Sequence, residues 1–295
     1  MAGSVARALF DEVGRVAADM GYRVDDAGPT PPARRLHLRA LLTRLADLER
    51  QSGDPSIGLR LGRQLAPVAV GVPGYLAMAG PTLLDALPRV MACQQLVAEG
   101  VRLRFVPDDD VVRFHLAHPG VAPRRVLSDL LVSAMRVFGV WLLGSQPPLS
   151  DVWFHYPRPA DRPGYEELFG VAPRFGAADD GFALARAWVS APLRTAEASL
   201  VPVLQAQATR LLASIREDAF LAGVSEVVVD RFASGEAADV GAVAGRLHTS
   251  PRTLQRRLRD HGLTFNRLVQ EVRRDLAERY LADERLSLVE VAGLL

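Results

Sequence analysis

The decapeptide Ser250–Arg259 constrains the fold of this chain more than any other segment, because it begins like a helix and separates its side chains by face. Ser250 can accept a hydrogen bond from a free backbone amide at the helix start, and Pro251 suits the first helical position, where its missing N–H costs nothing. Leu254 and Leu258 fall on one side of such a helix. The opposite side carries Arg252, Gln255, Arg256 and Arg259.

Arginine and glutamine on an exposed helix face are the side chains that read base edges. Arginine matches the two acceptors of guanine in the major groove, and glutamine matches the acceptor and donor of adenine. The same face could also be a solvated helix surface with no partner. The segment before it decides in favour of DNA, because it supplies a supporting helix.

That supporting helix is predicted at 239–247, with only His248 and Thr249 between it and the first segment. Asp239 is a suitable N-cap, and Ala244 is small enough for a close helix crossing. This is the spacing of a helix-turn-helix unit. His248 occupies the turn position where glycine is commonest, and a positive φ there is less costly for histidine than for a branched residue.

An internal repeat follows 48 residues later, where 290–295 aligns with 242–247 and Ser287 takes the place of Asp239. Between the copies, Thr264 can cap a long helix from Phe265 to about Ala282. The sequence stops at the residue before the second turn. We therefore expect the second reading helix to be absent from this chain.

Two helix-turn-helix units joined by one long helix resemble the DNA-binding domain of the AraC family of bacterial transcription regulators. The resemblance is strong from Val224 to Leu295, with its most specific strings at 250–258 and 271–277. It is weaker upstream. There, 52–62 and 165–170 are similar to the effector-binding domain of one AraC subgroup.

The resemblance implies roles for individual residues of the reading helix and its surroundings. Arg252, Gln255 and Arg256 occupy the base-reading positions. The DNA backbone would be contacted by Ser250, Thr253, Arg257, Arg259 and Thr264. The family further implies a promoter DNA partner, a small-molecule effector of unknown identity and a homodimer. It implies no cofactor.

Length and charge distribution favour two domains. At 295 residues and 49% hydrophobic composition, the chain can form two cores. The net charge is only +1, yet 246–279 holds nine arginines against Asp260, Glu271, Asp275 and Glu278. We predict an effector-binding and dimerisation domain at 1–217 and a truncated helix-turn-helix domain at 218–295.

The N-terminal domain is predicted to mix helices and strands, so the fold class is α+β with an incomplete all-α DNA-binding domain. A Pro-rich break is expected at 29–32. Helical spacing of leucines predicts helices at 36–52, 83–97, 123–143 and 201–215. Alternation predicts strands at 101–105, 111–116, 152–156 and 182–185, the first two forming a hairpin. The helix at 201–215 could contact a second copy or pack on its own domain.

Several other classes of protein find little support in the sequence. A lone Cys93 and the lack of a signal peptide indicate a cytoplasmic protein. The uncharged stretch Leu65–Leu84 is interrupted by proline and glycine, which favours buried loops and short helices over a membrane span. No catalytic motif or metal-binding spacing occurs, so we predict neither an enzyme nor a metal site.

The remaining histidines and aromatic residues are interpreted as structural. His115, His118 and His155 are predicted to be strand or turn residues, although a metal could bind if they converged in the fold. The aromatic side chains expected to pack in the core are Tyr75, Trp141, Trp153 and Phe154.

Together these patterns predict a sequence-specific, effector-responsive DNA-binding regulator. The alternative from another class is a ligand-sensing or dimer-poisoning antagonist without useful DNA affinity of its own. Losing one unit with several phosphate contacts would cost orders of magnitude in affinity.

Overall fold

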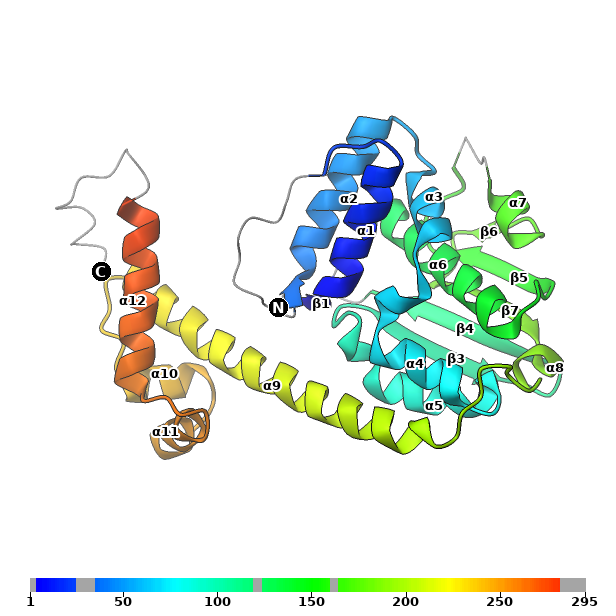
Figure 1. Cartoon of the computed structure of the whole chain (residues 1–295). Coiled ribbons are helices and arrows are strands. Elements are labelled where there is room, and N and C mark those ends of the chain that lie inside the picture. The colour runs from blue at the N-terminus through cyan, green and yellow to red at the C-terminus, as the bar shows by residue number, and fades with distance from the viewer. Residues whose placement is uncertain (1–3, 25–34, 119–123, 160–163, 282–295) are drawn as a thin grey trace. The chain divides into compact units, whose positions relative to one another are not determined.

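The computed structural model describes residues 4–24, 35–118, 124–159 and 164–281, and the chain divides into two compact units (Figure 1). Unit 1 spans Met1–Leu212 and unit 2 spans Ala213–Leu295. The division falls inside one helix, α9 (Leu200–Ala233), as does the predicted division after residue 217. The Pro-rich break at 29–32 and the second repeat at 287–295 lie outside the described residues.

Unit 1 is built on a five-stranded sheet in the order β3-β4-β7-β5-β6. Its strands are β3 (Arg102–Pro107), β4 (Val111–Ala117), β5 (Leu149–Phe154), β6 (Arg174–Phe175) and β7 (Asp180–Ala185). Neighbours are antiparallel except β5 and β6. The predicted hairpin is confirmed, because β3 and β4 pair around the turn that holds Asp108, Asp109 and Asp110.

Helices cover this sheet and form a second layer beyond it (Figure 1). They are α1 (Arg7–Asp19), α2 (Leu38–Ser52), α3 (Ile57–Gln64), α4 (Val72–Ala79), α5 (Leu83–Cys93), α6 (Arg125–Leu143), α7 (Tyr165–Phe169) and α8 (Arg186–Val189). Short 3-10 turns are η1 (Pro67–Val70) and η2 (Gln94–Leu96), and β1 (Ser4–Ala6) pairs with β2 (Arg35–His37). The Leu65–Leu84 stretch forms short helices and turns, as predicted.

Helix α6 is the central element of unit 1, because it belongs to two apolar clusters. Val132 and Leu142 pack in the cluster that includes the sheet, whereas Leu127 and Leu130 pack in the cluster of α1, α2 and α3. By length and composition α6 could cross a bilayer, and half of that stretch is buried inside the unit.

Two glycines let α3 lie directly on α6. A Cβ atom built on Gly58 would lie 2.4 Å from the carbonyl oxygen of Val126. One built on Gly62 would lie 1.9 Å from Ser133 Oγ and 2.4 Å from the carbonyl oxygen of Leu130. Backbone cannot yield by such amounts, so this crossing requires glycine at both positions.

Unit 2 is helical, with α10 (Val240–Arg246), α11 (Pro251–Asp260) and α12 (Phe265–Leu281) following the later part of α9. Its core contains Val224, Val228, Val243, Ala244, Leu254, Leu258, Phe265, Leu268, Val272 and Leu276. Leu254 and Leu258 are thus core residues, as predicted. The mixed unit 1 and helical unit 2 confirm the α+β class.

The helix predicted at 201–215 is longer than expected. It continues to Ala233 because an apolar stripe continues through Val224 and Val228, and a single Gly223 costs only about 1 kcal/mol in a helix interior. Within unit 1, Ala208 of this helix packs on Leu76 and Cys93, so this face packs on its own domain.

Two aromatic predictions were wrong. Trp153 and Phe154 are buried at 4% and 0% exposure, but Tyr75 and Trp141 are 44% and 46% exposed. Trp141 lies on α6 and stacks with Phe138, with ring centroids 6.1 Å apart. Helical spacing did not distinguish the inner face of α6 from its outer face, because this helix is apolar on both.

Candidate functional site

The turn between α10 and α11 has the local geometry that its sequence predicts. Asp239 Oδ1 accepts hydrogen bonds from the amides of Gly241 and Ala242, at 2.8 and 3.0 Å. Ser250 Oγ accepts from the Thr253 amide at 3.2 Å. His248 adopts a φ of 53°, the only positive φ of a described residue other than glycine. Both caps and the left-handed turn residue are therefore confirmed.

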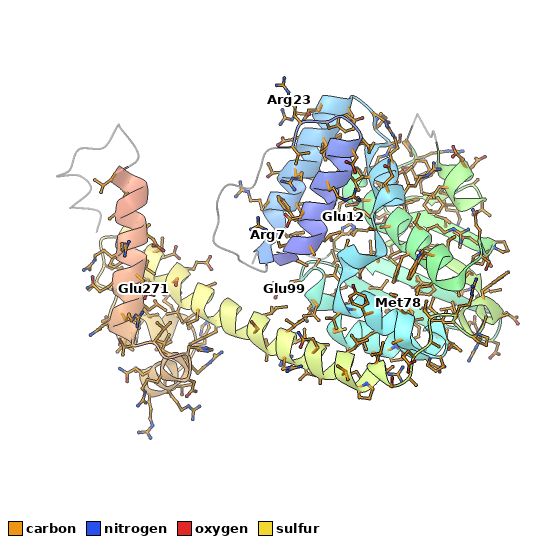
Figure 2. All side chains as sticks on the ribbon, viewed as in Figure 1. Arg7, Glu12, Arg23, Met78, Glu99 and Glu271 are labelled. Carbon is orange, nitrogen blue, oxygen red and sulfur yellow. The ribbon has the colours of Figure 1, made fainter. Side chains whose placement is uncertain are left out.

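The polar face of α11 projects away from the core of unit 2 (Figure 2). Arg252, Gln255 and Arg256 are exposed, while Leu254 and Leu258 on the other side are fully buried. Within the described residues, the guanidinium groups of Arg252 and Arg256 have no hydrogen bond or ion pair. Their donors remain available to a partner outside the unit.

The residues predicted to contact the DNA backbone differ in how much of their polar capacity is already used. The hydroxyl groups of Ser250 and Thr253 form a hydrogen bond of 2.9 Å at the start of α11. Thr264 Oγ1 accepts from the Arg267 amide at 3.2 Å, which confirms the predicted cap of α12. Arg259 is exposed, and its Nε donates to the carbonyl oxygen of Gln255 at 3.4 Å.

Arg257 has a structural contact that the local sequence did not predict. Its guanidinium carbon lies 3.7 Å from the ring centroid of Phe220 on α9, in a cation–π arrangement. Phe220 is 37 positions earlier in the chain, so helical spacing around Arg257 held no sign of it. Contact of Arg257 with a phosphate stays a prediction.

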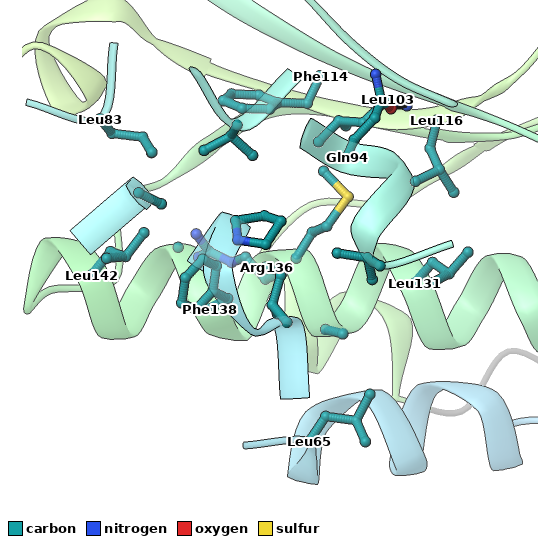
Figure 3. A pocket seen from close by; sticks show the side chains of 18 of the residues that line it. Leu65, Leu83, Gln94, Leu103, Phe114, Leu116, Leu131, Arg136, Phe138 and Leu142 are labelled. Carbon is teal, nitrogen blue, oxygen red and sulfur yellow. Dashed lines mark hydrogen bonds between the residues drawn. The ribbon is translucent and has the colours of Figure 1, made fainter. Parts of the chain in front are cut away.

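Unit 1 contains a cavity of about 210 Å³ between the sheet and α6 (Figure 3). Its sheet side is formed by Leu103, Phe114, Leu116, Phe182 and Leu184. Its α6 side is formed by Leu131, Ala134, Met135, Arg136, Phe138, Gly139, Leu142 and Leu143. Leu9, Leu65, Ala69, Pro73, Leu87 and Gln94 lie among the residues that close it.

Arg136 is the charged side chain of this lining. It is 4% exposed, its Nε has no hydrogen-bond partner, and no ion pair is formed with any described residue. Burial lowers the pKa of Arg136, but a guanidinium remains protonated at neutral pH. Gln94 is the other polar side chain of the lining. Its Oε1 accepts a hydrogen bond from the Leu103 amide at 2.6 Å, and its Nε2 donates to the carbonyl oxygen of Met91 at 3.3 Å.

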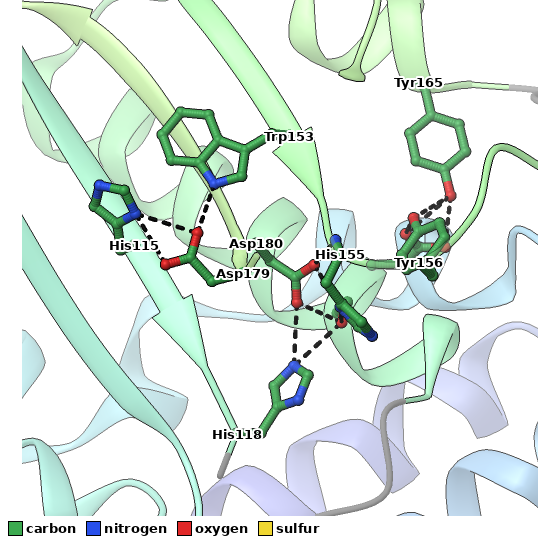
Figure 4. A network of polar contacts seen from close by, with 10 residues as sticks. His115, His118, Trp153, His155, Tyr156, Tyr165, Asp179 and Asp180 are labelled. Carbon is green, nitrogen blue, oxygen red and sulfur yellow. Dashed lines mark hydrogen bonds and ion pairs between the residues drawn. The ribbon is translucent and has the colours of Figure 1, made fainter. Parts of the chain in front are cut away.

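A buried polar network lies at one end of the sheet (Figure 4). Asp180, fully buried, accepts hydrogen bonds from Ser128 Oγ at 2.6 Å, His118 Nε2 at 3.1 Å and both His155 N and Nδ1 at 2.8 Å. Burial acts to raise the pKa of Asp180, but the hydrogen bonds outweigh it and hold this pKa below its ordinary value.

Asp129 on α6 forms the second buried carboxylate site. It accepts hydrogen bonds from the hydroxyl of Tyr156, from Tyr165 at 2.8 Å and from Arg125 Nε at 3.3 Å. Burial raises the pKa of Asp129 to about 6, although these hydrogen bonds act against the rise. The pKa values of the two buried aspartates, Asp180 and Asp129, therefore shift in opposite directions.

The fold brings together histidines that are dispersed in the sequence. Ligand atoms of His118, His155 and Asp180 lie within 4.8 Å of one another and could in principle hold a metal ion. The carboxylate of Asp180 is already occupied by four protein donors. The arrangement as it stands is a hydrogen-bond network whose members satisfy one another. Local sequence could not predict it, because His118 follows β4, His155 follows β5, Asp180 begins β7 and Ser128 lies on α6.

Sequence reasoning missed Arg136, although one signal was available. The stretch 126–143 contains only two charged residues, Asp129 and Arg136, in an otherwise apolar helix. Charged residues are almost never fully buried unless paired. A charge inside an apolar helix is therefore a candidate site, and this criterion would have selected both residues.

Comparison with known proteins identifies relatives for most of the chain. Residues 17–193 match the family described as the arabinose-binding N-terminal domain of AraC transcription regulators. The ornithine utilization regulator of Pseudomonas aeruginosa is 29% identical over 248 residues, covering 82% of this chain and 72% of the relative. The regulator VirS of Mycobacterium tuberculosis is 28% identical over 251 residues with the same coverage.

The fold is also found among solved structures. An example is the transcriptional regulator CdpR from Pseudomonas aeruginosa, with a TM-score of 0.52 and 23% identity. The match covers 97% of this chain and 90% of that one.

Proposed function

The chain belongs to the AraC family of transcription regulators, as a ligand-responsive member, and we propose that it reads promoter DNA through α11. Arg252, Gln255 and Arg256 would contact base edges in the major groove. One observation carries this proposal. The three side chains are exposed on the face of α11 opposite the buried Leu254 and Leu258. Helix α11 directly follows the turn of a helix-turn-helix unit, and its first turn is capped.

Contacts to the DNA backbone would hold α11 in register. Arg259 is exposed, and Ser250, Thr253 and Thr264 lie at two helix starts, where backbone amides favour anions. Arg257 would reach a phosphate while its guanidinium rests on Phe220. We assign residues 218–295 to this DNA-binding role.

Unit 1 would bind the effector and support a homodimer in the cytoplasm. Two copies place two reading helices on one duplex, which raises the effective concentration of the second. An effector that binds one arrangement of the protein more tightly shifts the population towards it. The family and its relatives are regulators rather than enzymes, so we assign no reaction to this chain.

The test is fluorescence anisotropy of the full chain with duplex DNA from upstream of its own locus and with a shuffled duplex. Measurements at roughly 50 and 200 mM salt separate specific from non-specific binding. We expect tighter binding to the upstream duplex, with the difference kept at the higher salt. Equal affinity for the two duplexes at both salts would contradict the proposal.

Substitution of α11 tests the base contacts. Arg256→Ala should weaken binding by about 1 to 3 kcal/mol and relax the preference at one base pair. Gln255→Ala should relax the sequence preference at a different base pair. The control is Arg104→Ala on the exposed side of β3, which removes the same charge from unit 1. Unchanged preference in Arg256→Ala would remove that residue from the reading surface.

A further inference from the structure

We propose that the cavity between the sheet and α6 binds an organic monocarboxylate with an apolar body, whose carboxylate pairs with Arg136. This inference deepens the effector role proposed for unit 1 and rests on it. The description of the matching family refers to arabinose. The argument comes from the chemistry of the cavity wall.

The first step is the apolar character of the lining. Every lining side chain described in the structure is apolar except Gln94 and Arg136, and the amide of Gln94 is already hydrogen-bonded within the protein. A sugar would bury several hydroxyls against this wall. Each buried hydroxyl without a partner costs about 1 to 3 kcal/mol, so the wall does not suit a polyhydroxylated ligand.

The second step is the unpaired charge of Arg136. An isolated buried charge costs several kcal/mol unless an opposite charge and hydrogen bonds compensate it. The wall itself supplies no carboxylate, since Asp129, on the same helix, is occupied by Tyr156, Tyr165 and Arg125. The planar donor fork of arginine matches a carboxylate with two parallel hydrogen bonds.

The third step is size. A cavity of about 210 Å³ has room for a medium-length chain or a single ring and excludes larger ligands. An apolar tail would lie against Phe114, Phe138 and Phe182. Burial of that tail supplies affinity, whereas Arg136 selects the anionic head.

The experiment is calorimetry and thermal shift of the full chain with three ten-carbon probes. Decanoate is the anion, decan-1-ol the neutral analogue and decylamine the cation, all kept below micelle formation. We expect decanoate to bind at least about tenfold more tightly than decan-1-ol, because only decanoate forms a charge-assisted pair. Decylamine should bind least. L-Arabinose should give no heat and no shift.

Substitutions identify the residue responsible. Arg136→Met should abolish the preference for decanoate while decan-1-ol still binds, and the ligand-free variant should melt no lower than the parent. Arg136→Lys should keep part of the preference. Arg104→Met, on the exposed side of β3 next to the lining residue Leu103, is the matched control and should change nothing.

Three results would overturn the inference. They are equal affinity of the parent for decanoate and decan-1-ol, an unchanged preference in Arg136→Met, and binding of L-arabinose in place of decanoate. The comparison of decanoate with decan-1-ol uses the unsubstituted protein, so its result does not depend on whether a variant folds. Anisotropy with DNA on the same preparation separates the two proposals, because specific DNA binding without a decanoate preference rejects only the ligand class.

Discussion

The exposed polar face of α11 and the cavity beside α6 each carry an arginine without a protein partner in the described residues, but the free-energy cost of leaving the arginine unpaired differs between them. Arg256 is exposed, so water solvates its charge, and the lack of a protein partner is ordinary for a surface residue. Arg136 is 4% exposed, so leaving its charge without a partner costs free energy. An unpaired charge indicates a partner more strongly the more deeply it is buried.

The two sites also differ in how they are assembled. The polar face of α11 comes from one helix and the turn before it, within 239–260. The cavity combines residues from α1 to β7, more than 170 positions apart in the chain. Damage to one site should therefore leave the other intact, and the following predictions test this independence.

The largest effect is expected for Leu254→Asp. A carboxylate in a site of 0% exposure should unfold unit 2, at a cost above about 4 kcal/mol. Far-UV circular dichroism should lose part of its helical signal. All three tryptophans lie in unit 1, so the urea transition followed by their fluorescence should be unchanged. Gln255→Asp, exposed on the same helix, is the control, and a fully folded Leu254→Asp would reject the core assignment.

Gly62→Ala is the reciprocal change in unit 1. Its Cβ would overlap Ser133 Oγ and the backbone of Leu130, so we expect unfolding to become easier by about 3 kcal/mol. The tryptophan transition should move to lower urea while sequence-specific DNA binding by α11 persists. Gly139→Ala is the matched control, because a Cβ at Gly139 meets no atom within 4 Å. Equal stability of the two variants would contradict the close crossing.

Acid titration of unit 1 should show the raised pKa of Asp129. Between an unfolded pKa near 4 and a folded pKa of about 6, the folded state binds more protons. The parent should therefore lose stability relative to Asp129→Asn as pH rises through this window, by about 1 to 3 kcal/mol. The difference should be constant above about pH 7. A difference that is flat from about pH 4 to 7 would show that the carboxyl titrates normally in the fold.

The smallest effect is expected for Arg259→Ala. Loss of one phosphate contact should weaken binding to every duplex alike and reduce the slope of log affinity against log salt by about 1. Arg104→Ala again controls for net charge. A loss confined to one sequence would move Arg259 from the backbone contacts to the base contacts.

These two regions also show which parts of the structure could be read from the sequence. The caps at Asp239 and Ser250, the turn at His248 and the hairpin around Asp108–Asp110 depend on neighbours within a few positions, and each was predicted correctly. The stacking of Arg257 on Phe220 and the convergence of His118 and His155 on Asp180 depend on tertiary packing. Spacing along the chain contains no information about such contacts.

The glycine crossing between α3 and α6 sets limits on how this protein can diverge. The turns of α6 near Val126, Leu130 and Ser133 are held against Gly58 and Gly62 and tolerate almost no added volume. The cavity lining begins at Leu131 and lies mostly further along the helix, between Ala134 and Leu143. Substitutions in the second half of α6 can thus reshape the cavity wall, while the first half preserves the packing of α3 on α6.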